Sequence, residues 1–132
     1  MTDMPNLDIS EKLMPCTFKF HNFNIKVGDV TISCEIIKME DCLYLWIGDC
    51  ANPNMNDLSF ALMSRFERQP IATKIMGAVA DPTSTNVASR LSMKLGKPVY
   101  VSFNATANNI TLPAIEKGIQ EEFKTHADLL SF

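Results

Sequence analysis

The side chains that could do chemistry are few and far apart in this sequence. Two histidines, His21 and His126, are the candidate bases. The candidate nucleophiles are the four cysteines Cys16, Cys34, Cys42 and Cys50. A reactive thiolate needs a nearby base or a helix N-terminus that lowers the pKa of the thiol, and the sequence shows no recognisable pairing of this kind. We therefore expect buried free thiols and a protein without catalytic residues.

Other reactive groups give no stronger signal. The hydroxyls of Thr83-Ser84-Thr85 lack a local base, which a nucleophile requires. Glu121 and Glu122 are adjacent acids on a predicted helix, where we expect water to surround them. No C-x-x-C, H-x-x-x-H or D-x-D spacing indicates a metal, and the five glycines are too scattered to cradle a phosphate. We expect neither a metal nor a cofactor, a structural or surface role for His21, and His126 at a helix C-terminus.

Charge and hydropathy limit the classes of partner. The formal net charge of −3 argues against a nucleic-acid surface. Residues 65–97 are locally basic, with six Lys or Arg and two acids, whereas 1–64 hold four bases and nine acids. This basic segment is either a solvated helix face or a patch that meets an acidic partner. No apolar run approaches the roughly 18 residues of a membrane span, and no signal peptide precedes the domain, so we expect a cytosolic or nuclear protein.

The first half of the chain reads as strands. Aromatic and β-branched residues predict strands at 17–26, 30–38, 42–48, 58–66 and 71–77, although a short helix also fits 58–66. In 30–38 the apolar residues alternate with polar ones, which predicts one dry face. In LYLWIG both faces are apolar, because Tyr44 and Trp46 alternate with leucine and isoleucine. That pattern predicts a central strand that is covered on both sides.

The second half reads as helix, strand, helix. Asp81 is a suitable N-cap for a helix over 82–95, which ends where Gly96 supplies the left-handed C′ position. A strand at 99–104 and a helix capped by Thr111 follow. Together these elements predict an α+β fold: a six-stranded, mainly antiparallel β-sheet or sandwich with flanking helices. We expect residues 1–16 to be a flexible segment and residues 17–132 to form a single domain.

Several segments taken together resemble the proteasome assembly chaperone 4 family. They are HNF at 21–23, LYLWIG at 43–48, LSFALMSRF at 58–66, IATKIMG, and DPTSTNVASRLSMKLGKPVYVSFN at 81–104. The last is the most specific, because D-x-T-S-T-x-x-A-x-R-L runs into K-x-V-x-V-S-x-N. The likeness extends from about residue 20 to about 124. The 49–57 and 104–110 loops and the segment before Thr17 depart from the pattern.

The resemblance implies a non-enzymatic chaperone of the 20S proteasome with the sheet fold predicted above. Members of the family pair with proteasome assembly chaperone 3, a structurally similar protein. The heterodimer binds α-type subunits, helps to order the α-ring and leaves as β-type subunits join. The resemblance implies no cofactor, and the charge and hydropathy given above predict no nucleic acid and no membrane as partners. An unpaired sheet edge is a plausible dimer surface, through which the isolated chain could form a substitute homodimer.

On this hypothesis the predicted helix over 82–95 presents its polar face to another protein. Interface energy concentrates in a few aromatic or arginine anchors. The candidate partner-binding residues are Trp46, Arg65, Phe66, Thr83, Ser84, Arg90, Lys94 and Tyr100. Tyr44 is a further aromatic candidate for an anchor. We expect Arg90→Glu or Lys94→Glu to weaken α-subunit binding with little loss of stability.

Two other functions remain open from the residues alone. A homodimeric scaffold of the same fold could serve another complex, and failure to bind proteasome α subunits would favour it. An enzyme could use one of the cysteines, and uniformly slow labelling of the native thiols would exclude it.

Overall fold

The computed structural model describes residues 17–66, 68–106 and 108–132, so the predicted flexible segment 1–16 lies outside the described residues, as does Cys16. The strands are β1 (Lys19–Val27), β2 (Val30–Lys38), β3 (Leu43–Asp49), β4 (Leu58–Met63), β5 (Pro70–Met76) and β6 (Val99–Phe103). The helices are α2 (Thr83–Leu95), α3 (Thr111–Thr125) and the short 3₁₀ helix η1 (Ala127–Leu130). These elements fall where the residue patterns predict them, and the ambiguous 58–66 segment is a strand.

The six strands form one sheet in the order β1-β2-β3-β6-β4-β5. Each neighbouring pair is antiparallel except β3 and β6, which run parallel. Parallel neighbours need a long crossover, and β4, β5 and α2 together provide it. Short turns join β1 to β2 and β4 to β5, which explains why those sequential pairs are antiparallel. The structure thus confirms the mainly antiparallel prediction and shows a single sheet.

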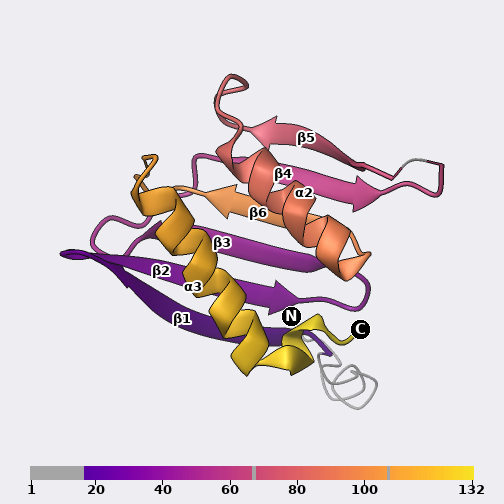
Figure 1. Ribbon diagram of the computed structural model, residues 1–132, viewed down its shortest axis with the longest axis horizontal. Coiled ribbons are helices and arrows are strands. Elements are labelled where there is room, and N and C mark those ends of the chain that lie inside the picture. Colours follow the sequence, from indigo (N-terminus) through magenta and orange to yellow (C-terminus); the bar gives the residue numbers. More distant parts are fainter. Residues whose placement is uncertain (1–16, 67, 107) are drawn as a thin grey trace, which may run out of the picture.

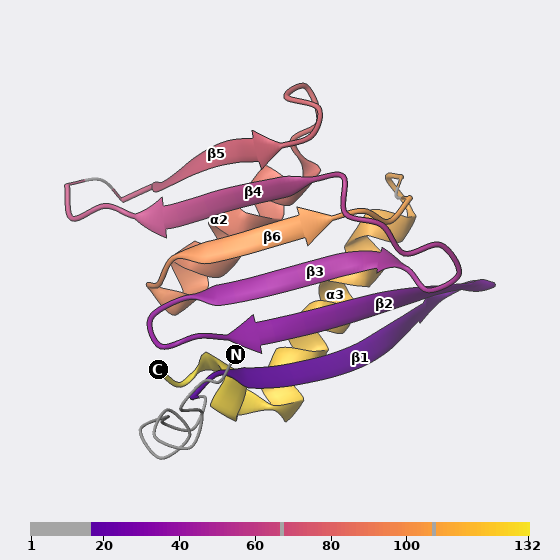
Figure 2. The same cartoon turned by 180° about the vertical axis from the view of Figure 1, so that it is seen from behind.

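The two α-helices lie on the same face of the sheet, α2 over β4, β5 and β6 and α3 over the β1 side (Figure 1). Seen from behind, the opposite face carries none of the helices that the described residues form (Figure 2). The core lies between the sheet and the helix layer. Its largest fully buried side chains include Phe123, Ile32, Ile36, Leu43, Leu45, Ile47, Leu91 and Ile115. Neither helix is long and apolar enough to cross a membrane.

The helix ends follow the predicted chemistry with two differences. Gly96 adopts φ 69° and closes α2, as predicted. The helix begins at Thr83, one residue later than expected, yet the Asp81 carboxylate still accepts the Thr83 N–H at 3.1 Å. At α3, Thr111 is the first helical residue and does not cap the helix. The Asn108 side chain does so, because its Oδ1 accepts the N–H groups of Ile110 and Thr111.

Among residues 17–66, 68–106 and 108–132, nothing covers the second side of β3 as a layer, contrary to the prediction. Leu43, Leu45 and Ile47 point toward the helices and have no exposed surface. Tyr44 and Trp46 point the other way and are only partly buried. The two apolar faces identified β3 as a central strand correctly, but the layer over Tyr44 and Trp46 is missing from the described fold.

Candidate functional site: the open face of the sheet

The uncovered side of the sheet, here called the open face, is built from alternate residues of neighbouring strands. Tyr44 of β3 lies opposite Tyr100 of β6, which lies opposite Phe60 of β4. The Phe60 and Tyr100 rings are 4.6 Å apart between centroids and tilted by 45°, a favourable aromatic geometry. Pairing in register places aromatic side chains in a row across three central strands.

Apolar side chains continue the row to the β1 edge, whereas at the other edge Thr73 of β5 lies opposite Phe60. Ile37 lies opposite Tyr44 and next to Phe20, and Glu35 lies opposite Trp46. The apolar part of the open face comprises Phe20, Ile37, Tyr44, Trp46, Phe60, Leu62, Ile71 and Tyr100, and the same alternation places Asn22, Asn24, Lys26, Ser33, Glu35 and Thr73 beside them. None of these side chains is buried, and Phe20 is 63% exposed. Contiguous apolar surface of this kind on a soluble protein marks an interaction site.

Trp46 is held in a fixed position on the open face. Its indole Nε1 donates a hydrogen bond to the Asn54 carbonyl at 3.0 Å, which ties the ring to the loop after β3. A Cβ at Gly48 would come within 2.5 Å of the indole, so only glycine leaves room for the ring there. Tyr44, Trp46 and neighbouring residues line a hollow of about 390 Å³. The ring is therefore pre-positioned, which reduces the entropy lost on binding.

The aromatic row itself carries no charged side chain, and Glu35 lies beside it, opposite Trp46. Burial is the largest cause that raises the pKa of Tyr44, the charge of Glu35 also raises it, and Ser102 acts in the opposite direction. The Tyr44 hydroxyl therefore keeps its proton at neutral pH and can donate a hydrogen bond. An amphipathic aromatic surface with few ions is typical of the central part of protein interfaces.

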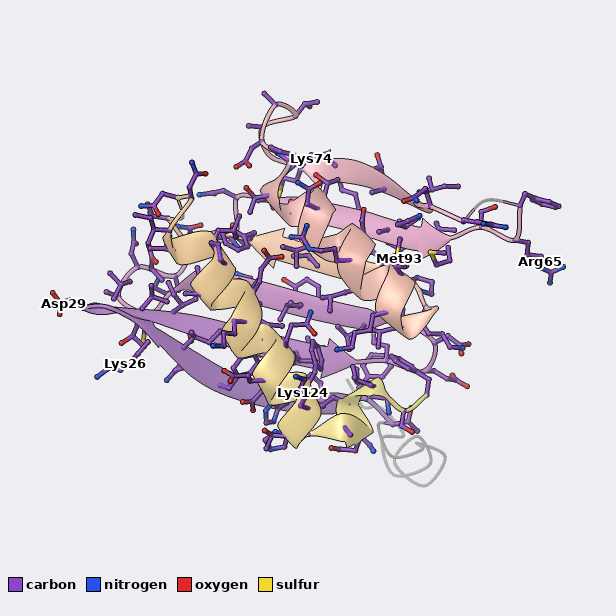
Figure 3. The ribbon with its side chains drawn as sticks, in the orientation of Figure 1. Lys26, Asp29, Arg65, Lys74, Met93 and Lys124 are labelled. Atoms are coloured by element: carbon purple, nitrogen blue, oxygen red, sulfur yellow. The ribbon has the colours of Figure 1, made fainter. Side chains whose placement is uncertain are left out.

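Arg65 and Phe66 lie on a different surface, at the tip of the β4–β5 hairpin. Phe66 is 92% exposed and Arg65 projects from the end of the molecule (Figure 3). The hairpin tip is separate from the aromatic row, although the strands that carry it contribute Phe60 to the open face. Of the sequence candidates, Trp46 and Tyr100 thus lie on the open face, and Arg65 and Phe66 lie together at the tip.

Ser84 is not on the surface, which corrects its place among the partner-binding candidates. Its side chain is fully buried, and its Oγ lies 2.6 Å from the Oγ of Ser59 and accepts a hydrogen bond from Lys74 at 2.9 Å. Lys74 also pairs with Asp57 at 2.5 Å. This polar cluster joins α2 to the sheet. The neighbouring Thr83 is occupied at the helix start, where its hydroxyl donates to Asp81 at 2.7 Å.

The helix residues Arg90 and Lys94 face α3, whereas the sequence suggested that they face a partner. Arg90 pairs with Glu116, and Lys94 donates to Gln120 at 2.7 Å. The Arg90 side chain nevertheless remains 54% exposed. The basic segment 65–97 does not form one patch, because Lys74 is buried in a polar cluster and Arg65 lies at the hairpin tip (Figure 3).

The structure brings together three groups that sequence reasoning kept apart. His21 Nε2 lies 2.5 Å from Glu122 Oε2, and His126 Nδ1 lies 3.2 Å from the same oxygen. Glu122 was expected to be solvated, but only 22% of its side chain is exposed, while Glu121 is exposed as expected. The i,i+4 spacing of Glu122 and His126 was a usable signal. His21 is 101 residues away from Glu122 in the sequence, and only the packing of α3 on β1 brings the two side chains together.

Two of the described cysteines lie where burial and nearby negative charge oppose thiolate formation. Cys34 is 1% exposed, and burial, with a smaller contribution from the charge of Glu122, raises the pKa of its thiol to about 12. Burial and the Asp41 charge also raise the pKa of Cys42. Cys34, Cys42 and Cys50 are all free thiols. The raised pKa values of Cys34 and Cys42 disfavour their thiolate forms.

Known proteins match this chain in sequence and in fold. The sequence profile of the family described as Proteasome assembly chaperone 4 matches residues 31–105. Proteasome assembly chaperone 4 of Mus musculus is 36% identical over 107 residues, covering 80% of this chain and 85% of the mouse protein. The Homo sapiens protein of the same name is 35% identical over 106 residues, covering 79% and 84%.

A solved structure has the same fold. One chain from "Crystal Structure of a Novel Chaperone Complex for Yeast 20S Proteasome Assembly" aligns with a TM-score of 0.55 over 86% of this chain and 94% of that chain. Its sequence identity of 14% makes this a likeness of fold, and it confirms the predicted α+β class. The matched profile and the two mammalian relatives show more: this chain belongs to the proteasome assembly chaperone 4 family.

Proposed function

We propose that this chain is a non-enzymatic chaperone that promotes assembly of the 20S proteasome α-ring. It acts as a heterodimer with a paralogous, proteasome assembly chaperone 3-like partner and leaves as β subunits join. Family membership supports the chaperone role. The open face is the observation that supports the heterodimer, because its aromatic residues are only partly covered and Trp46 is held in place.

The occupant of the open face is the partner chaperone. The solved structure with this fold comes from a chaperone complex, which favours a partner of similar architecture. Two sheets pack face to face at about 10 Å when each contributes an apolar face. A sheet of the partner laid on Tyr44, Trp46 and Tyr100 would cover the side of β3 that the sequence marks as buried. A heterodimer would therefore supply a layer that the described part of the single chain does not provide.

The α-type subunits bind elsewhere in this proposal. The hairpin tip with Arg65 and Phe66 projects beyond the sheet and stays accessible when the open face is occupied. Arginine and phenylalanine are residues that interfaces favour. The net charge of −3 makes nucleic acid a poor partner. We place the protein in the cytosol, with the nucleus as a second site, and its action requires no cofactor.

A matched pair of variants tests the heterodimer. Tyr100→Ser removes an aromatic ring from the open face, and Met93→Ser removes a 50% exposed side chain from the outer side of α2. Each variant is co-expressed with the partner chaperone and captured by a tag on the partner. Loss of this chain with Tyr100→Ser but not with Met93→Ser supports the proposal. Equal capture of both variants contradicts it.

Trp46 provides a second readout, because it is the single tryptophan of the sequence. Adding a partner chaperone whose own tryptophans are replaced by phenylalanine should shift the Trp46 emission to shorter wavelength, since the partner excludes water from the indole. Tyr100→Ser should reduce that shift at equal concentrations, and Met93→Ser should leave it unchanged. An unchanged emission on complex formation would place the partner on another surface.

The open face also favours an alternative occupant, a second copy of this chain. A homodimeric scaffold serving another complex would bury the same aromatic row between two identical sheets. Light scattering of the purified chain, alone and with the partner, separates the two functions. A homodimer that the partner converts into a heterodimer is a substitute pairing, whereas a homodimer that the partner does not disturb supports the scaffold.

A further inference from the structure

His21, Glu122 and His126 form a compact cluster on the helix side of the sheet, away from the open face. His21 belongs to β1 and Glu122 to the last turn of α3, and His126 is the residue that follows α3. The two imidazole rings are 4.4 Å apart between centroids. The nearest ligand atoms of all three side chains lie within 4.8 Å of one another. Three groups from separated segments therefore converge on one small volume.

The contacts within the cluster leave one polar atom without a partner. Glu122 Oε2 is 2.5 Å from His21 Nε2, where the two form a hydrogen bond. His126 Nδ1 lies 3.2 Å from the same oxygen, close enough for an ion pair, but the pair lacks the orientation of a hydrogen bond. This nitrogen is buried, although 42% of the His126 side chain is exposed. Buried polar atoms without partners are rare and call for an explanation.

The donor set is that of a borderline transition metal. Imidazole nitrogen suits zinc, copper, nickel and iron, and two histidines with one carboxylate are a known three-ligand zinc set with an open fourth position. Zinc–nitrogen bonds of about 2.0–2.1 Å in tetrahedral geometry put neighbouring ligand atoms roughly 3.3 Å apart. The separation of Glu122 from His126, 3.2 Å, already fits. The shorter contact of Glu122 with His21 opens by a small rotation of the carboxylate.

We propose that His21 Nε2, Glu122 and His126 Nδ1 bind a divalent transition metal ion, with Zn²⁺ as the physiological candidate. The ion takes the place of the His21–Glu122 hydrogen bond and gives His126 Nδ1 a partner. It links the end of α3 to the edge strand β1, where α3 contacts the sheet. The site is a structural clamp for the C-terminal helix, and it does not depend on the proposed chaperone activity.

The first experiment adds Zn²⁺ or Co²⁺ to the metal-free full chain. An ion that binds only the folded state stabilises it by mass action, so the midpoint of thermal unfolding should rise with the Zn²⁺ concentration. Bound Co²⁺ should show the visible absorption of a low-coordinate site with nitrogen and oxygen ligands. A strong thiolate-to-metal band would assign the ion to the cysteines and overturn the proposal. Absence of both the thermal shift and the spectrum would leave a simple hydrogen-bonded cluster and also overturn it.

Variants identify the ligands. His126→Ala and Glu122→Gln each remove one donor, and Glu121→Gln is the matched control because it changes the adjacent, exposed carboxylate. Loss of an outer partner of a metal site costs about 10–100-fold in affinity, so loss of a ligand should cost at least that much. The control should retain full affinity. Equal Zn²⁺ affinity in all three folded variants would overturn the ligand assignment.

His21→Ala tests the contribution of β1, and it also removes the hydrogen bond to Glu122. If that variant fails to fold, His21→Gln retains a hydrogen-bonding side chain and can be used in its place. The decisive readout is the difference in unfolding midpoint with and without Zn²⁺, measured for each variant against its own metal-free form. The rise seen for the unmodified chain should be lost in the His21 variant. A full Zn²⁺-dependent rise of the unfolding midpoint in the His21 variant would overturn the three-ligand site.

Discussion

The two faces of β3 show how one strand serves two purposes. Leu43, Leu45 and Ile47 face the helices and have no exposed surface, whereas Tyr44 and Trp46 face the open side and remain partly exposed. The side facing the helices is aliphatic and the open side is aromatic. Because side chains alternate along a strand, each face can be altered without replacing a residue of the other. The difference separates what holds the chain together from what it offers to another protein.

The strongest test of this separation is a cavity on the helix face. Leu45→Ala removes a fully buried side chain between the sheet and the helices. Leucine-to-alanine changes in cores cost about 2–5 kcal/mol of the free energy of unfolding. Urea unfolding should show a loss in this range, and partner binding should fall only as far as the folded fraction falls. A loss well below this range would mean that the helix layer does not seal this part of the core.

A change on the open face should weaken partner binding beyond what its loss of stability explains. Gly48→Ala places a Cβ where the Trp46 indole now lies. Moving the ring costs about 1–3 kcal/mol of stability as an overpacking effect. If Trp46 is a binding hot spot, its displacement costs at least about 2 kcal/mol of binding free energy.

The two costs of Gly48→Ala are measured separately. Trp46 emission of the isolated chain reports the ring position, and titration with the partner chaperone at a temperature where the variant is folded reports affinity. Met93→Ser on α2 again serves as the control for an exposed apolar loss. Unchanged affinity together with altered Trp46 emission would remove Trp46 from the interface and leave the rest of the open face in place.

Alkaline pH tests the helix face in another way. The pKa of the Cys34 thiol rises from its ordinary value of 9.0 to about 12, chiefly through burial. Between these values the unfolded chain releases a proton that the folded chain keeps. The free energy of unfolding should therefore fall as pH rises above about 9, by at most about 1.4 kcal/mol per pH unit from this group. Cys34→Ala should flatten that part of the stability profile.

Alkylation gives an independent check on Cys34. At pH 8 iodoacetamide should modify the exposed Cys50 quickly and Cys34 only after unfolding, since a buried thiol without its thiolate form is unreactive. Rapid modification of Cys34 in the folded protein would revive the cysteine-based enzyme as a function.

Local patterns predicted the elements well, and the contacts between elements account for what they missed. The alternation in VTISCEIIK and the Gly96 helix end depend on neighbours in sequence, so both could be read directly. The burial of Ser84 and the pairing of Arg90 with Glu116 depend on where α2 lies relative to β5 and α3. From the sequence alone, a serine or arginine on a helix is equally compatible with a solvent-exposed position and with a contact inside the fold. The open face was visible as two apolar sides of β3, but the sequence cannot show that no described element of the chain covers the second side.

The smallest expected effect concerns the outer side of the helix layer. Arg90→Glu would place a second acid beside Glu116, and exposed ion pairs contribute about 0–1 kcal/mol, so the loss of stability should stay within that range. The exchange variant Arg90→Glu with Glu116→Arg should recover most of it. Lys94→Glu should cost less, since Gln120 carries no charge.

Binding of α-type subunits decides what the Arg90 and Lys94 changes mean. If the helices act only in the fold, Arg90→Glu weakens binding no more than its loss of stability requires, and the exchange variant binds normally. If Lys94→Glu weakens binding while thermal unfolding is unchanged, the helix layer contacts the α subunits directly. The division between a folding face and a binding face would then fail, because the protein would present partner surfaces on both sides of its sheet.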